Sequence, residues 1–139
     1  MQKENRQLHF ILIDDSDIDL FFHDKLIRLQ GISTNISSFS NAPHALDYLA
    51  LYKDKASLYP ETIILLDIQM PEMDGFDFLD HFEKMPEHIL KKSRIFMVSS
   101  SLDHGDLSRS HAHHLIDHIL TKPLNAEELK NALEKVTFQ

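Results

Sequence analysis

The sequence contains no cysteine, which excludes disulfides, thiol catalysis and thiolate metal sites. Positive charge is also scarce: 14 Lys and Arg stand against 22 Asp and Glu, a formal net charge of -8. Such a surface repels polyanions, so direct nucleic-acid binding is not expected. The N-terminus has no apolar signal core, and no apolar run approaches the roughly 18 residues that span a membrane. We therefore expect a soluble, cytoplasmic protein without membrane insertion.

The chain also has no internal repeat, low-complexity tract or interdomain linker. Its 139 residues suit one domain, and its proportions of 42% hydrophobic and 26% charged residues are those of ordinary globular proteins, which excludes intrinsic disorder. We expect a short N-terminal tail at residues 1–7, a single domain at residues 8–137 and no output domain.

Five short apolar runs alternate with amphipathic stretches, a pattern typical of repeated βα units around a parallel sheet. The runs cover residues 8–14, 35–39, 62–67, 94–99 and 118–121. Runs one, three and four are nearly continuous in apolar residues, as in central strands that are covered on both faces. The run at 35–39 is more polar and predicts an edge strand.

Helices are predicted between these runs, at residues 16–30, 41–50, 76–84, 103–114 and 125–136. The first has an apolar stripe at helical spacing and ends before Gly31. The stripe consists of Ile18, Phe21, Phe22, Lys25, Leu26 and Leu29. Asn41 and Asn125 are the expected caps of the second and last helices.

Polar side chains stand where the predicted strands end. Asp14 and Asp15 follow the first strand, Asp67 ends the third, Ser99 ends the fourth and Lys122 follows the fifth. In a parallel α/β sheet, ligands bind beyond the carboxyl ends of the strands. Three carboxylates at one place need compensating positive charge, which a divalent cation and one ammonium supply. The sequence therefore predicts a pocket for magnesium and phosphate.

The residue types in this pocket suit phosphoryl transfer. A carboxylate can attack phosphorus to form an acyl phosphate, and Asp67 stands alone at the end of the central strand. Asp15 and Asp67 are expected to hold Mg²⁺, with Asp14 acting partly through water. Lys122 supplies a second positive charge. The Ser99 hydroxyl can donate a hydrogen bond to a phosphoryl oxygen only after phosphorylation, which is the basis of a switch.

Four segments, ILIDDSD, LLDIQMPEMDG, MVSS and LTKPL, resemble the landmarks of the response-regulator receiver domain of two-component signalling. The resemblance covers residues 8–137. It implies an α/β fold of the (βα)5 flavodoxin-like type, a doubly wound five-stranded parallel sheet in the order 2-1-3-4-5. It also implies a stand-alone receiver in which Asp67 accepts a phosphoryl group from a histidine kinase or a phosphotransfer protein. Such a protein is a switch that catalyses only its own phosphorylation and dephosphorylation, and acts on an unknown downstream protein target.

The resemblance also implies particular ligands. Asp15, Asp67 and the backbone carbonyl of Gln69 would hold Mg²⁺, with Asp14 and Ser100 beside them.

By the same resemblance Ser99 is the switch hydroxyl, Lys122 is the phosphate-binding lysine, and the bond from Lys122 to Pro123 is expected to be cis. One departure from the family concerns the signal. Ile119 stands where many receivers have a switching Tyr or Phe, and His118 replaces the small residue before it. Any signal must then travel through loop movement and repacking of Ile119.

Two surfaces are expected to bind proteins by the same resemblance. The first helix, through Ile18 and Phe21 or Phe22, is the predicted kinase-docking surface. The face between the helix at 103–114 and the last helix, including His118 and Ile119, is the predicted output surface.

Other functions fit the residues less well. A receiver-like binding module that works without phosphorylation is the main alternative, although it would have no need for a complete acidic and lysine set. A phosphatase with Asp15 as nucleophile would normally have Thr or Val where Asp19 stands. A calcium loop starting at Asp15 would require Gly and Glu at the positions of Leu20 and Leu26.

The histidines near the C-terminal third could also suggest a metal site. His111, His113, His114 and His118 lie close in sequence, and His111 and His114 would share a helix face. No strong ligand motif accompanies them, so a solvated cluster is the favoured interpretation.

Overall fold

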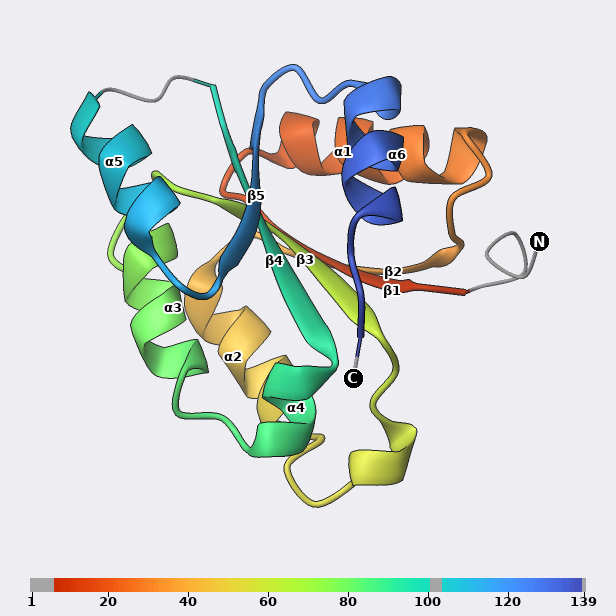
Figure 1. Cartoon of the computed structure of the whole chain (residues 1–139), viewed down its shortest axis with the longest axis vertical. Helices are drawn as coiled ribbons and strands as arrows, with labels where there is room; N and C mark the ends of the chain where they lie inside the picture. Colours follow the sequence, from red (N-terminus) through yellow and green to blue (C-terminus); the bar gives the residue numbers. More distant parts are fainter. Residues whose placement is uncertain (1–6, 101–103, 139) are drawn as a thin grey trace.

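Five parallel strands form one sheet in the order β2-β1-β3-β4-β5 (Figure 1). The structure, a computed structural model, describes residues 7–100 and 104–138. The strands are β1 (His9–Ile13), β2 (Asn35–Phe39), β3 (Thr62–Asp67), β4 (Ser93–Ser99) and β5 (Ile116–Thr121). The flavodoxin-like fold, the strand order and the edge position of β2 confirm the sequence prediction. β1 and β3 are buried along their whole length, as their continuous apolar runs require.

Helices cover both faces of the sheet. They are α1 (Asp17–Leu29), α2 (Ala42–Ala50), α3 (Gly75–Phe82), α4 (Glu87–Lys91), α5 (His104–Ala112) and α6 (Ala126–Glu134), with a 3-10 turn at Ala56–Leu58. Figure 1 shows α1 and α6 on one side of the sheet and α2, α3 and α4 on the other. No helix in the described part of the chain is long and apolar enough to cross a bilayer.

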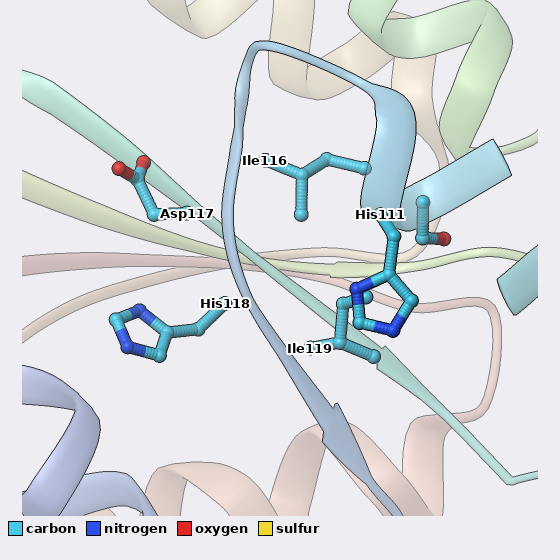
Figure 2. A pocket seen from close by; sticks show the side chains of 6 residues that line it. His111, Ile116, Asp117, His118 and Ile119 are labelled. Carbon is cyan, nitrogen blue, oxygen red and sulfur yellow. The ribbon is translucent and has the colours of Figure 1, made fainter. Parts of the chain in front are cut away.

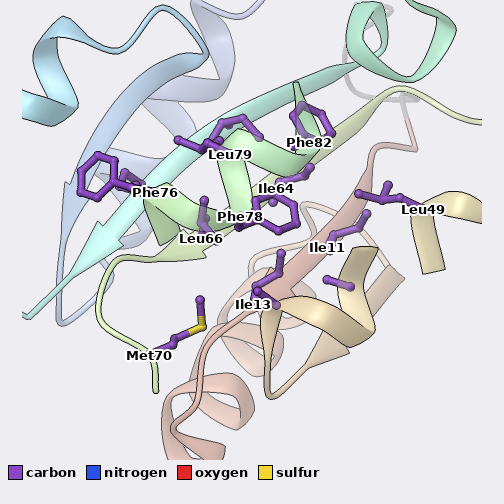
Figure 3. Close-up of a cluster of buried hydrophobic side chains, with 14 of the residues drawn as sticks. Ile11, Ile13, Leu49, Ile64, Leu66, Met70, Phe76, Phe78, Leu79 and Phe82 are labelled. Atoms are coloured by element: carbon purple, nitrogen blue, oxygen red, sulfur yellow. The ribbon is translucent and has the colours of Figure 1, made fainter. Parts of the chain in front are cut away.

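Each face of the sheet has its own hydrophobic core. On the side of α2 and α3, strand residues such as Ile64 and Leu66 pack against Leu49, Phe78 and neighbouring aromatic residues (Figure 3). On the other side, Phe10, Leu65 and Phe96 pack with Ile27 of α1 and Leu129 of α6. Two filled layers fix the sheet rigidly, so the loops at its carboxyl edge start from defined positions.

The predicted caps are present. Asn41 accepts the His44 N–H at 2.9 Å and Asn125 accepts the Glu128 N–H at 2.9 Å. Gly31, with φ at 69°, adopts the left-handed conformation that ends α1.

Apart from Leu26, the apolar stripe predicted for α1 faces solvent rather than the sheet. Ile18 and Leu29 are 80% and 81% exposed, and Phe21 is also exposed. The buried face consists of His23 and Ile27, with Leu20 and Leu26 partly buried beside them. The helix therefore has two apolar faces, of which only one packs on the fold.

Several helices and strands differ from the sequence prediction in their presence or their bounds. α4 was not predicted, because this helix has five residues and no side-chain cap. α5 ends at Ala112, so His113 and His114 lie beyond it and the prediction that His111 and His114 share a helix face is wrong. Residues 1–6 of the predicted tail, and residue 103 at the predicted start of α5, lie outside the described residues.

β5 begins two residues before its predicted start because it contains a bulge. Ile95 pairs with Ile116 and Phe96 with His118, so Asp117 is an extra residue in the ladder. The Asp117 carboxylate accepts the Ile95 N–H at 3.1 Å. Burial raises the pKa of Asp117, and the Ile95 hydrogen bond acts against that rise. A side chain thus supplies the acceptor at the point where strand pairing is interrupted.

Candidate functional site

Three carboxylates meet at the carboxyl ends of the two central strands. Asp14 directly follows β1 and Asp67 ends β3, and the register pairs the residues before them, Ile13 and Leu66. Asp14, Asp15 and Asp67 each offer an oxygen within 4.8 Å of the others, with Asp14 and Asp67 buried and Asp15 exposed. Within residues 7–100 and 104–138, no other group of three or more acidic or histidine ligands comes this close.

The Lys122 ammonium lies among these carboxylates. Its Nζ is 2.7 Å from Asp14 Oδ2, 2.9 Å from Asp19 Oδ2 and 3.4 Å from Asp67 Oδ1. The backbone holds the residue in place, because the Lys122 N–H donates to the Ser99 carbonyl at 2.9 Å. The bond from Lys122 to Pro123 is cis, as expected.

The charges in the site are strongly coupled. The pKa of Asp67 is raised to about 6, mainly by burial and next by the nearby Asp14 carboxylate, while Lys122 acts in the opposite direction. Burial alone would lower the pKa of Lys122, but hydrogen bonds to Asp14 and Asp19 outweigh it and the pKa lies above its ordinary value. Lys122 therefore stays charged, while the site as a whole retains surplus negative charge.

Two loops are shaped to present the carboxylates. The Ser16 N–H donates to Asp14 Oδ1 at 2.9 Å, which orients that carboxylate. In the loop after β3, the Gly75 N–H donates to the Ile68 carbonyl at 2.8 Å. A Cβ on Gly75 would lie 2.6 Å from the backbone oxygen of Asp67, so this close approach requires glycine.

The remaining predicted site residues lie at the carboxyl ends of β3 and β4. Ser99 is buried at the end of β4 and Ser100, the next residue, is exposed. Gln69 is exposed in the loop after Asp67. These positions agree with the strand assignments that led to their selection, and their roles stay predictions.

The donor set fits a hard divalent cation. Mg²⁺ prefers oxygen ligands, keeps several waters and is usually bound through one or two carboxylates. Asp15 and Asp67 provide such oxygens, one exposed and one buried. The other buried carboxylate, Asp14, is already neutralised by Lys122 at 2.7 Å. Asp15 and Asp67 are therefore placed to bind a cation, next to the ammonium of Lys122.

Two residues near the pocket were missed as site residues by sequence reasoning. Asp19 reaches Lys122 from the first turn of α1, a contact between positions 103 residues apart. His23 is buried on the same helix; burial lowers its pKa and the Asp14 charge opposes that shift. Their positions in the helix that begins after Ser16 could be predicted from the sequence. Their closeness to Lys122 depends on the fold.

The predicted output surface contains a cavity of about 310 Å³ along β5. Figure 2 shows His111, Ile116 and Ile119 on one side of the strand, and Asp117 and His118 on the other. Ser110 Oγ and His118 Nδ1 are buried without a hydrogen-bond partner in the described part of the chain.

The histidines near β5 make contacts of other kinds. The rings of His113 and His114 stack at 5.4 Å, and His114 Nε2 lies 3.1 Å from Glu83 Oε2.

Comparison with known proteins agrees with this geometry. The family model of the response regulator receiver domain matches residues 10–134, and the chain belongs to this family. The chain is 36% identical to a response regulator receiver protein of Dyadobacter fermentans, with a TM-score of 0.79, covering 91% of this chain and 98% of that one. It is 30% identical over 132 residues to a two-component response regulator of Oryza sativa subsp. japonica, covering 93% of this chain but only 20% of that relative's length.

A third similarity concerns a solved structure with bound metal. The receiver domain of a histidine kinase from Arabidopsis thaliana, complexed with Mg²⁺, superposes with a TM-score of 0.78 at 21% identity, covering 97% of this chain and 96% of that one. At this identity the likeness concerns the fold. Receiver domains are phospho-accepting switches of two-component signalling that bind Mg²⁺ at an acidic pocket and interact with histidine kinases or phosphotransfer proteins.

Proposed function

We propose that this protein is a receiver in which Asp67 accepts a phosphoryl group from a phosphohistidine. The observation that carries the proposal is a carboxylate only 6% exposed at the end of the central strand, with an ammonium 3.4 Å away. The Asp67 oxygen attacks phosphorus, the bond from phosphorus to the imidazole nitrogen breaks, and the electron pair leaves with the imidazole.

Asp15, Asp67 and the Gln69 carbonyl would hold Mg²⁺, with Asp14 and Ser100 beside them. The ion would neutralise charge on the phosphoryl oxygens. Its binding would also relieve the surplus negative charge of the pocket.

The same residues explain how phosphorylation would act as a switch. The new phosphoryl oxygens would accept a hydrogen bond from the Ser99 hydroxyl and would form an ion pair with Lys122. Ser99 ends β4 and its register partner is Thr121 of β5, so movement there reaches the edge strand. Ile119, partly buried against the core, would repack in place of an aromatic rotamer. The cavity lined by α5 and β5 is the proposed output surface for a downstream protein.

The solvent-facing stripe of α1 is the proposed kinase-docking surface. Ile18, Phe21 and Phe22 expose large apolar side chains in the first half of α1, which begins three residues after Asp14. Leu29 extends the exposed stripe to the far end of the helix. Replacing Phe21 with Ala should slow phosphorylation by a kinase or phosphotransfer protein and leave labelling by a small phosphodonor unchanged. Leu58→Ala, which removes an equally exposed apolar side chain from the 3-10 turn before β3, is the control.

The phosphorylated protein would also catalyse its own slow dephosphorylation. It would act in the cytoplasm, because kinases charge their histidine from cytoplasmic ATP.

The experiment that tests phospho-acceptance is intact-mass analysis after incubation with acetyl phosphate. Wild type should gain one phosphoryl group only with Mg²⁺ present, and Asp67→Asn should gain none. An adduct that persists in Asp67→Asn and maps to Asp15 would instead indicate a phosphatase-like nucleophile on the first strand. A folded wild type that gains nothing from acetyl phosphate or from a charged kinase would favour the phosphorylation-independent binding module.

A further inference from the structure

Asp19 is a fourth acidic residue at the pocket, and its contact with Lys122 is closer than that of Asp67. The Lys122 Nζ lies 2.9 Å from Asp19 Oδ2 and 3.4 Å from Asp67 Oδ1. The first distance is that of a charge-assisted hydrogen bond, whereas the second is longer than such bonds normally are. In the unphosphorylated protein, Lys122 therefore pairs more closely with Asp14 and with Asp19 of α1 than with the phospho-acceptor.

The first turn of α1 leaves the Asp19 carboxylate available for this role. Ser16 caps the helix and accepts the Asp19 N–H at 3.2 Å. In a reciprocal capping box, an acidic residue at this position would accept the Ser16 N–H. Here Asp14 accepts that N–H at 2.9 Å, and the Asp19 side chain extends to Lys122 instead. The hydrogen bond to Lys122 lowers the pKa of Asp19, so the contact is an ion pair at neutral pH.

We propose that Asp19 is a positioning residue that restrains Lys122 and thereby slows phosphorylation of Asp67; the inference rests on the phospho-acceptor role proposed above. When a phosphoryl group transfers, its oxygens attract the ammonium, which has three N–H donors to share. Asp14 is buried and stays bonded to it. Asp19, whose side chain is 35% exposed, competes with the phosphoryl oxygens for the remaining donors.

Asp19→Asn is the decisive variant, because it keeps the side-chain size and removes the charge that holds Lys122. At saturating acetyl phosphate and Mg²⁺, its maximal rate of Asp67 phosphorylation should be about threefold to fivefold above wild type, the size of one partly exposed ion pair. Asp19→Glu, which restores the charge on a longer side chain, should return the rate toward that of wild type.

Asp17→Asn is the matched control, since it removes the same charge from the same exposed turn. Among the described residues, the carboxylates paired with Lys122 are Asp14, Asp19 and Asp67, and not Asp17. Loss of general repulsion toward an anionic donor should lower the half-saturating donor concentration in both Asn variants, while only Asp19→Asn should raise the maximal rate.

Three results would overturn the inference. In the first, the maximal phosphorylation rate of Asp19→Asn equals or falls below that of wild type. In the second, Asp17→Asn raises the maximal rate as much as Asp19→Asn does. In the third, Asp19→Glu raises the maximal rate as much as Asp19→Asn does. Each of these leaves the phospho-acceptor role intact as long as wild type is labelled and Asp67→Asn is not. Absence of label in wild type would instead defeat the proposed function, and the inference with it.

Discussion

Asp67→Asn should stabilise the metal-free protein at alkaline pH and not at acid pH. Native Asp67 has a pKa of about 6, whereas the ordinary value is 3.8. Between these values the native state binds more protons than the unfolded state, so the free energy of unfolding falls as the pH rises. The difference of about two in pKa corresponds to roughly 3 kcal/mol, which is the most that the ionised carboxylate costs above pH 6. Asparagine has the same shape without the charge.

The assay is urea unfolding of wild type and Asp67→Asn with EDTA, at several values between about pH 4 and pH 8. We expect the variant to be more stable by about 1 to 3 kcal/mol near pH 8, with the difference declining toward zero near pH 4. Asp80→Asn, which removes an exposed carboxylate from α3, is the control for loss of one negative charge. A stability difference that does not change with pH, or a variant less stable than wild type at pH 8, would refute the electrostatic reasoning.

Three other perturbations have defined outcomes. Gly75→Ala should destabilise the fold by about 1 to 3 kcal/mol and impair Asp67 labelling, because its Cβ would lie 2.6 Å from a backbone oxygen; unfolding and intact-mass assays measure both. Burial lowers the pKa of His9 to about 4, so the free energy of unfolding of the wild type should fall by up to about 3 kcal/mol as the pH drops from 6.5 to 4. His9→Gln should lack this loss, which unfolding curves at several pH values would measure. Arg109→Ala should increase hydrogen exchange in α5 by several-fold, since its guanidinium lies 4.0 Å from the Phe76 ring centre; unchanged exchange would mean that this contact does not hold the helix.

The strands and their terminal residues could be predicted because burial on both faces leaves a continuous apolar run in the sequence. The position of Asp67 next to Asp14 follows from the parallel register of β1 and β3, since residues at the same strand end lie at the same sheet edge. The cap of α6 at Asn125 was visible for a similar reason, because capping is a local interaction between residues three apart.

The features that could not be predicted depend on contacts distant in sequence. Periodicity identified the helix α1 but not which of its two apolar faces packs, because that depends on the sheet behind His23 and Ile27. The contact of Asp19 with Lys122 joins the first helix to the fifth strand end, and no local pattern indicates it. α4 is only five residues long, too short for a periodic signal.

The bulge at Asp117 has a consequence for association between molecules. β5 is an edge strand, and a regular edge offers a row of backbone groups on which another chain can add a strand. The extra residue breaks the spacing of that row, and the carboxylate that accepts the Ile95 N–H places a negatively charged residue at the break. An incoming β-strand would therefore lose register at Asp117. This should disfavour continuous sheet formation and aggregation at the edge beside the proposed output surface, while side-chain docking there stays possible.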